Sequence, residues 1–109
     1  MTMPTFHHLD IPALDDWLAG EARLTLVDIR DPLSFAQGHI PGSCRLDNDS
    51  VATFLEEATP DIPLVVVCYH GHSSQQAAAW LAGQGFREVY SLDGGFTEWQ
   101  HRHPDRVAR

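Results

Sequence analysis

The feature that most constrains the fold is an apolar segment that runs directly into a polar loop and then a helix. Residues 64–67 read Leu-Val-Val-Val and lead into Cys68. Such a run, bounded by turn residues, is typical of a strand buried on both faces of a parallel sheet. Residues 75–81 are rich in alanine and predict a helix. This order of strand, tight loop and helix places the loop at the carboxyl end of the sheet, where open α/β folds bind their ligands.

Cys68 lies between the end of the predicted strand and the start of the predicted helix, close to backbone N–H groups that can stabilise negative charge. The first N–H groups of a helix lack partners within the helix and lie at the positive end of its dipole. N–H groups of a tight loop also converge on anions. Such donors favour the thiolate, which is the nucleophilic form of cysteine. Cys68 is therefore a candidate nucleophile, and the loop is a candidate site for the anion that it attacks. The candidate loop residues are Tyr69, His70, Gly71, His72, Ser73 and Ser74.

The competing interpretation of Cys68 is a small buried hydrophobic residue, which is the common role of a cysteine at the end of an apolar strand. A structural cysteine needs neither a glycine three residues later nor the histidines and paired serines that follow. The loop therefore favours the nucleophile.

Three segments of the chain resemble the signatures of the rhodanese family, and within it those of the single-domain thiosulfate sulfurtransferases. They are residues 27–32 with 38–42, residues 68–74, and residues 90–96 with Trp99. The three lie in the order expected for the family and cover nearly the whole chain. The resemblance implies a rhodanese-like α/β domain and a sulfurtransferase that works by double displacement through a persulfide on Cys68. Thiosulfate is the implied sulfur donor. Cyanide, a small thiol or a dithiol protein such as thioredoxin is the implied acceptor, and no metal or organic cofactor is implied.

The length of the loop separates this chain from related enzymes. From Cys68 to Ser73 the loop has six residues. Related phosphatases and arsenate reductases have one residue more and end in an Arg that binds the tetrahedral oxyanion, so a phosphatase is disfavoured. Ser73 stands where many rhodaneses carry Arg. Gln75 stands where a Lys is common in the similar single-domain enzymes, and losing that cation would weaken thiosulfate binding or change the preferred donor.

Two alternatives to a thiosulfate sulfurtransferase stay open. A persulfide carrier would form the same intermediate but receive its sulfur from a partner protein. A redox sensor would join Cys68 to Cys44, whose sulfurs would then have to lie within bonding reach. For Cys44 itself we expect a small buried residue at the end of a short strand.

The remaining polar candidates receive structural interpretations. Asp28 and Arg30 bracket a strand end, and we expect an ion pair that holds neighbouring loops together. We expect His39 to help build a loop near the site and to take no part in catalysis. His70 and His72 lack a second Cys/His pair at zinc-site spacing, so we expect no metal.

Length and charge narrow the class of protein. The chain has 109 residues, which predicts one domain over residues 1–109, with 105–109 as a frayed tail. A formal net charge of −8 argues against nucleic acid and anionic membranes as partners. An anionic substrate must then be attracted locally, by loop amides and the helix dipole.

No apolar run approaches the roughly 20 residues of a membrane span, and the first residues do not resemble a secretory signal. Two cysteines form no disulfide framework, so we expect a cytoplasmic protein.

The order of elements predicts an α/β domain with a mostly parallel central sheet of four to five strands and helices on both faces. Helix starts are indicated at Asp10, at Asp31, within residues 48–50, at about Ser74 and near Phe96, and strands are indicated at 24–29, 44–46, 64–67 and 88–92.

Overall fold

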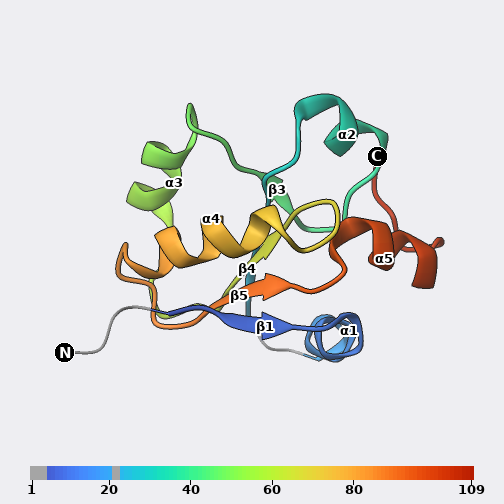
Figure 1. Cartoon of the computed structure of the whole chain (residues 1–109), viewed down its shortest axis with the longest axis horizontal. Coiled ribbons are helices and arrows are strands. Elements are labelled where there is room, and N and C mark those ends of the chain that lie inside the picture. Colours follow the sequence, from blue (N-terminus) through green and yellow to red (C-terminus); the bar gives the residue numbers. More distant parts are fainter. Residues whose placement is uncertain (1–4, 21–22) are drawn as a thin grey trace.

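A parallel sheet is the frame on which the rest of the chain is placed. The computed structural model describes residues 5–20 and 23–109. The sheet has five strands in the order β1-β5-β4-β2-β3, and every pairing between these strands is parallel (Figure 1). The strands are β1 (His7–Leu9), β2 (Thr25–Asp28), β3 (Cys44–Arg45), β4 (Leu64–Val67) and β5 (Val89–Leu92). The prediction of an α/β domain with a parallel sheet of four to five strands is confirmed.

The central strand is β4, and all four of its residues are buried. This explains its continuous apolar sequence, because helices cover both faces of a parallel sheet. The edge strand β1 was not predicted from the sequence. It has three residues, two of them exposed histidines, so it lacks the alternating pattern that indicates a strand.

Five helices accompany the strands. They are α1 (Ile11–Ala19), α2 (Pro32–Gln37), α3 (Val51–Glu57), α4 (Ser73–Ala82) and α5 (Gly95–Arg102). The predicted caps of α1 and α2 are confirmed. The carboxylate of Asp10 accepts a hydrogen bond from the N–H of Ala13 at 2.9 Å, and that of Asp31 accepts from Ser34 at 2.8 Å.

The start of α3 differs from the prediction of a cap within residues 48–50. Ser50 precedes the helix but makes no side-chain cap. Asp47 serves instead, and its Oδ1 accepts from the N–H groups of Asp49 and Ser50, both at 2.9 Å. The carboxylate therefore acts one residue earlier than the capping pattern indicated, on the turn that leads into the helix.

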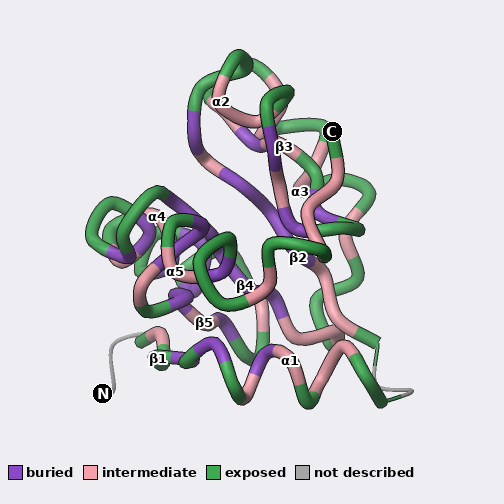
Figure 2. The backbone as a smooth tube through the Cα atoms, turned by 90° about the vertical axis from the view of Figure 1, so that its right-hand side faces the viewer, coloured by how far each residue is buried: buried purple, intermediate pink, exposed green. Residues whose placement is uncertain are grey.

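Two hydrophobic clusters cover opposite faces of the sheet. One includes Leu14 of α1 and Trp99 of α5, both fully buried, and the other includes Ala78 and Leu81 of α4. The buried parts of the backbone gather along the central strands (Figure 2). The prediction of helices on both faces is confirmed. None of the helices among the described residues is both long and apolar enough to cross a membrane.

The C-terminal segment differs from the predicted frayed tail at 105–109. His39 and Ala108 exchange two backbone hydrogen bonds, at 2.9 and 2.8 Å. The indole N–H of Trp99 donates to the carbonyl of Arg106 at 2.8 Å, and the Arg106 guanidinium pairs with Asp15. The segment is held because its backbone finds partners far away in the sequence, which the composition of a terminus does not reveal.

The predicted ion pair of Asp28 and Arg30 is confirmed. The Arg30 Nη2 lies 2.7 Å from Asp28 Oδ2 and donates to the Gly38 carbonyl, also at 2.7 Å. Both side chains are buried. The pair thus joins the end of β2 to the turn after α2. His39 in that turn stacks on Phe35 with the ring centroids 3.8 Å apart, and its Nδ1 donates to the Phe35 carbonyl at 2.7 Å.

Candidate active site

Cys68 lies between the end of β4 and the start of α4, where the loop turns back over its sulfur. The Sγ accepts hydrogen bonds from the backbone N–H groups of Gly71 and Ser74, at 3.1 and 3.3 Å. The hydroxyl of Ser74 lies 3.2 Å from the same sulfur. Cys68 is only 3% exposed. The loop predicted to surround an anion therefore surrounds this sulfur.

These contacts set the protonation of Cys68. Burial by itself raises the pKa of the thiol. The Ser74 hydroxyl and the N–H groups of Ser74, Gly71 and His70 act in the opposite direction because they bond to the charged form. Together they outweigh burial and lower the pKa of Cys68 below its ordinary value. A larger thiolate fraction at neutral pH makes the sulfur a better nucleophile.

Gly71 allows the loop to turn this tightly. Its φ is +92°, in the left-handed region that favours glycine. A Cβ at this position would lie 2.9 Å from the nitrogen of Gly94 and 3.0 Å from the carbonyl oxygen of Leu92. The backbone of the segment after β5 therefore passes directly against the loop.

The N-terminal end of α5 also holds the loop, and the sequence did not predict this contact. The N–H of Phe96 donates to the carbonyl of Cys68 at 2.8 Å, and that of Thr97 donates to Tyr69 at 3.0 Å. A Cβ on Gly95 would lie 2.5 Å from both carbonyl oxygens. The loop and the start of α5 lie side by side in Figure 1. The paired glycines at 94–95 were the available signal, but they indicate a turn and not its partner.

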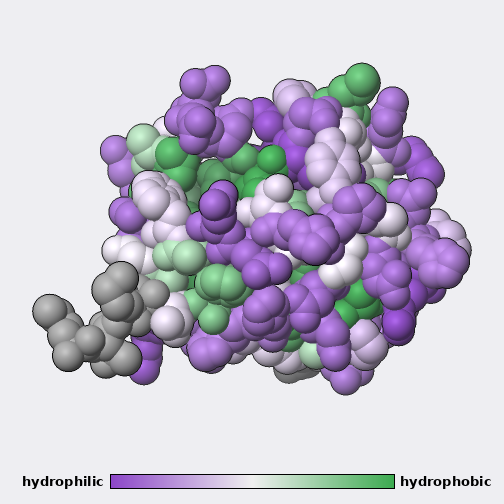
Figure 3. Space-filling model, in the orientation of Figure 1, coloured by the Kyte–Doolittle hydropathy of each residue, from purple (hydrophilic) through white to green (hydrophobic). Residues whose placement is uncertain are grey.

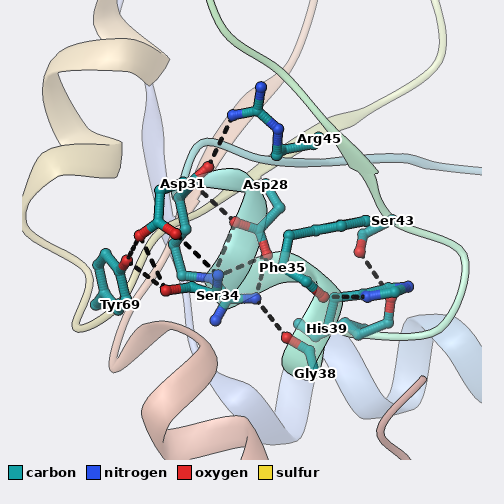
Figure 4. A network of polar contacts seen from close by, with 11 residues as sticks. Asp28, Asp31, Ser34, Phe35, Gly38, His39, Ser43, Arg45 and Tyr69 are labelled. Atoms are coloured by element: carbon teal, nitrogen blue, oxygen red, sulfur yellow. Dashed lines mark hydrogen bonds and ion pairs between the residues drawn. The ribbon is translucent and has the colours of Figure 1, made fainter. Parts of the chain in front are cut away.

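Tyr69 connects the loop to α2. Its hydroxyl donates to the carboxylate of Asp31 and lies 2.8 Å from the Ser34 hydroxyl (Figure 4). The Tyr69 hydroxyl is the main reason that the pKa of Asp31 lies well below its ordinary value. The buried guanidinium of Arg30 lies 5.6 Å from the centroid of the Tyr69 ring and 4.2 Å from that of Phe96.

The other predicted loop residues lie at the exposed mouth of the site. His70, His72 and Ser73 are exposed, and no hydrogen bond joins their side chains to Cys68 in the described part of the chain. Gln75 lies in the first turn of α4, where its side-chain amide donates to the Gly71 carbonyl at 2.8 Å. Within residues 5–20 and 23–109, no group of three His, Cys, Asp or Glu side chains is placed to hold a metal ion.

Cys44 is exposed, and the expectation that it is buried was wrong. It belongs to β3, a strand of two residues at the edge of the sheet. An edge strand of this length leaves one side of the residue open to solvent.

An apolar groove lies beside the loop without including it. The groove has a volume of about 480 Å³ and lies between α3 and α4, where Figure 3 shows hydrophobic residues in a recess. Its apolar lining consists of Ile29, Leu46, Val51, Ala77, Trp80 and Leu81.

Comparison with known proteins agrees with this geometry. The profile of the rhodanese-like domain matches residues 11–102, which is most of the chain. The chain belongs to the rhodanese family. The loop that follows the central strand, residues 68–74, is one of the three segments that resemble the signatures of this family.

Individual rhodanese relatives are similar over most of their length. The chain is 62% identical over 86 residues to the thiosulfate sulfurtransferase GlpE of Stutzerimonas stutzeri, covering 79% of both chains. It is 56% identical over 89 residues to the protein of the same name from Pseudomonas syringae, covering 82% of this chain and 84% of the relative. The rhodanese-like domain of an Anabaena protein superposes with a TM-score of 0.78 at 26% identity, covering 94% of this chain and 76% of that one.

Proposed function

We propose that this rhodanese-family protein is a thiosulfate sulfurtransferase in which Cys68 is the nucleophile. The observation that carries the proposal is the ring of donors around the Cys68 sulfur, formed by the N–H groups of Gly71 and Ser74 and the Ser74 hydroxyl. Relatives with 56–62% identity are named thiosulfate sulfurtransferases.

The reaction has two halves, each with its own nucleophile. In the first, the Cys68 thiolate forms a bond to the outer sulfur of thiosulfate. The S–S bond of thiosulfate breaks, sulfite leaves with the electron pair, and Cys68 carries a persulfide. In the second, cyanide or a thiolate attacks the outer persulfide sulfur, which it removes as thiocyanate or as a new persulfide. The Cys68 thiolate is restored, so the kinetics are ping-pong.

The donors of the loop have a role in both halves. They stabilise negative charge at the sulfur before attack and again when Cys68 becomes the leaving group. They also supply the local attraction that a protein of net charge −8 needs for a dianionic substrate. The side chains of His70, His72 and Ser73 are exposed at the mouth of the site. The sulfonate end of thiosulfate would lie on that side when its outer sulfur faces Cys68.

The topology disfavours the redox sensor of Cys68 and Cys44. Val27 of β2 pairs with Cys44 on one side and with Val66 of β4 on the other. Cys44 and Val66 therefore lie two strand spacings apart, about 9–10 Å between Cα atoms. Cys68 follows two residues beyond Val66, past the end of β4, so its Cα is at least as far from Cys44. A disulfide needs a Cα separation below about 7 Å, so the sheet would have to rearrange for the two sulfurs to bond.

Intact mass measured before and after addition of thiosulfate tests the proposal. We expect the protein to gain one sulfur atom and to lose it on addition of cyanide, with release of thiocyanate. Cys68→Ala should gain nothing, and Cys44→Ala should behave like the unchanged protein.

Two results would contradict this assignment. Sulfur gain by Cys68→Ala would exclude Cys68 as the nucleophile. No gain by the unchanged protein while Cys68 stays reduced would exclude thiosulfate as donor. If Cys68 then received sulfur from a protein persulfide, the alternative function of a persulfide carrier would be supported.

A further inference from the structure

Ser91 is a buried polar residue that has no role in the reaction described above. It lies in β5 between β1 and β4, pairs with His8 and Val66, and is fully buried. A hydroxyl in such a place is unfavourable unless it is hydrogen-bonded. Its Oγ lies 2.7 Å from the Oγ of Ser74, which is also fully buried. Within the described residues, Ser74 is the one hydrogen-bond partner of the Ser91 side chain.

Ser91, Ser74 and Cys68 are joined by consecutive hydrogen bonds, and the positions of the hydrogens in them follow from the charge on the thiolate. A thiolate only accepts hydrogen bonds, so the Ser74 hydroxyl, 3.2 Å from the Cys68 sulfur, must donate its single hydrogen to it. Ser74 then has no hydrogen left for Ser91. The 2.7 Å contact must be a bond from the Ser91 hydroxyl to the Ser74 oxygen. This arrangement also gives the Ser91 hydrogen its acceptor.

We propose that Ser91 is a positioning residue that directs the Ser74 hydroxyl at the Cys68 sulfur and thereby stabilises the thiolate. The Ser91 hydroxyl donates to Ser74 and occupies the acceptor side of that oxygen, so the Ser74 hydrogen points to the sulfur. Hydrogen bonds in such a chain polarise one another, which strengthens the last bond. Without Ser91, the Ser74 hydroxyl loses the partner that orients it.

The proposal concerns the nucleophile of the proposed sulfurtransferase, but its test needs no sulfur transfer. The pH dependence of Cys68 alkylation by iodoacetamide reports the thiolate directly. The Cys44→Ser background removes the exposed second thiol from the measurement. Ser91→Ala should raise the pH midpoint of alkylation by about 0.3–1 unit, because one polarising hydrogen bond is lost. Below the midpoint the alkylation rate should fall about two- to tenfold.

A double-mutant cycle separates positioning from a merely structural role. Ser74→Ala should raise the midpoint further than Ser91→Ala, since it removes the bond to sulfur itself. The double variant should match Ser74→Ala alone, because Ser91 acts through Ser74. Ser43→Ala is the matched control. Its buried hydroxyl donates to the Ile40 carbonyl at 2.7 Å, and its removal should leave the midpoint unchanged.

The outcomes are distinct. A midpoint in Ser91→Ala within 0.1 unit of the background, or a further shift in the double variant beyond Ser74→Ala, would overturn the proposal. Ser91→Thr keeps the hydroxyl and, if folded by circular dichroism, should restore the midpoint. If the unchanged protein failed to take sulfur from thiosulfate, the proposed function would fail while the alkylation cycle would still decide the role of Ser91.

Discussion

The reactivity of Cys68 depends on a balance between burial and hydrogen bonding at one sulfur atom. Burial disfavours the thiolate, and four groups of the loop, the Ser74 hydroxyl and the N–H groups of Ser74, Gly71 and His70, together favour it more strongly. The net effect is a pKa below the ordinary value of 9.0. The thiolate is therefore available at a lower pH than in an unfolded chain.

We predict that sulfur transfer to Cys68 rises with pH and levels off with a midpoint below 9.0. The sign follows from the nucleophile, because protonation below the midpoint removes the thiolate. Sulfite release in a single turnover with excess thiosulfate, measured across the pH range, gives this midpoint. Alkylation of the urea-unfolded chain should titrate at the ordinary value. A folded midpoint at or above the unfolded one would contradict the prediction.

Gly71 gives a second prediction at the scale of a single residue. Gly71→Ala should lower the free energy of unfolding by about 1–3 kcal/mol, since a strained φ and a backbone clash act together. Sulfur transfer should fall about tenfold to a hundredfold, because the Gly71 N–H moves away from the sulfur. Urea denaturation and single-turnover rates measure the two effects.

The matched control is Gly42→Ala. Gly42 has a φ of +88°, but a Cβ there meets nothing within 4 Å. Its substitution should cost about 1 kcal/mol and leave sulfur transfer intact. Equal loss of activity in both variants would show that the close approach to Gly94 is unimportant.

At the scale of elements, the loop is held between two helices that lie apart in the sequence. The N–H groups at the start of α5 bond to the loop carbonyls, and Tyr69 bonds to the start of α2. These contacts immobilise the backbone whose N–H groups face Cys68. The rigidity of the site thus comes from neighbouring elements as well as from the loop itself.

We predict that Tyr69→Phe raises the pKa of Asp31 towards its ordinary value of 3.8, since the Tyr69 hydroxyl is the main group that lowers it. Carboxyl titration by NMR measures this shift. The lowered pKa of Asp31 stabilises the fold above pH 3.8, and this contribution is lost as the pH falls towards the folded pKa. The variant should therefore be less stable than the unchanged protein at neutral pH, and the difference should shrink in acid.

Tyr90→Phe is the control for Tyr69→Phe. The Tyr90 hydroxyl donates to Glu88 at 3.0 Å and does not contact Asp31. Its removal should leave the Asp31 titration unchanged. An unchanged Asp31 titration in Tyr69→Phe would show that the bond between the loop and α2 does not form in solution.

At the scale of the whole molecule, the C-terminal segment fastens α5 to α1 and to the turn after α2. Arg106 reaches Asp15, and Ala108 pairs with His39. Val107 packs on the core cluster that contains Trp99. The segment therefore supports the helix that holds the loop around Cys68.

We predict that removal of residues 105–109 lowers the free energy of unfolding by about 1–3 kcal/mol, because the Trp99 indole N–H and the His39 backbone lose their partners. Urea denaturation measures this loss. Removal of Arg109 alone should have almost no effect. Equal stability of the two shortened chains would contradict the role assigned to the segment.

The parts of the fold that were predictable rest on interactions between neighbours in the sequence. The apolar run of β4 and the capping carboxylates Asp10 and Asp31 act over a few residues, and the structure confirms each of them. The loop after Cys68 could be predicted for the same reason, since its donors lie within six residues of the sulfur. Its place at the carboxyl end of a central strand followed from the order of strand, loop and helix.

The rest depended on contacts between distant segments, which local patterns do not encode. Ser91 meets Ser74 across 17 residues, and Tyr69 meets Asp31 across 38. The exposure of Cys44 follows from the place of β3 at the sheet edge. The sequence by itself therefore indicated Cys68 as the candidate nucleophile, together with the loop that holds the nearest of its donors. Only the tertiary structure decided what holds those donors in place, because strand order and helix docking bring together groups that no sequence spacing relates.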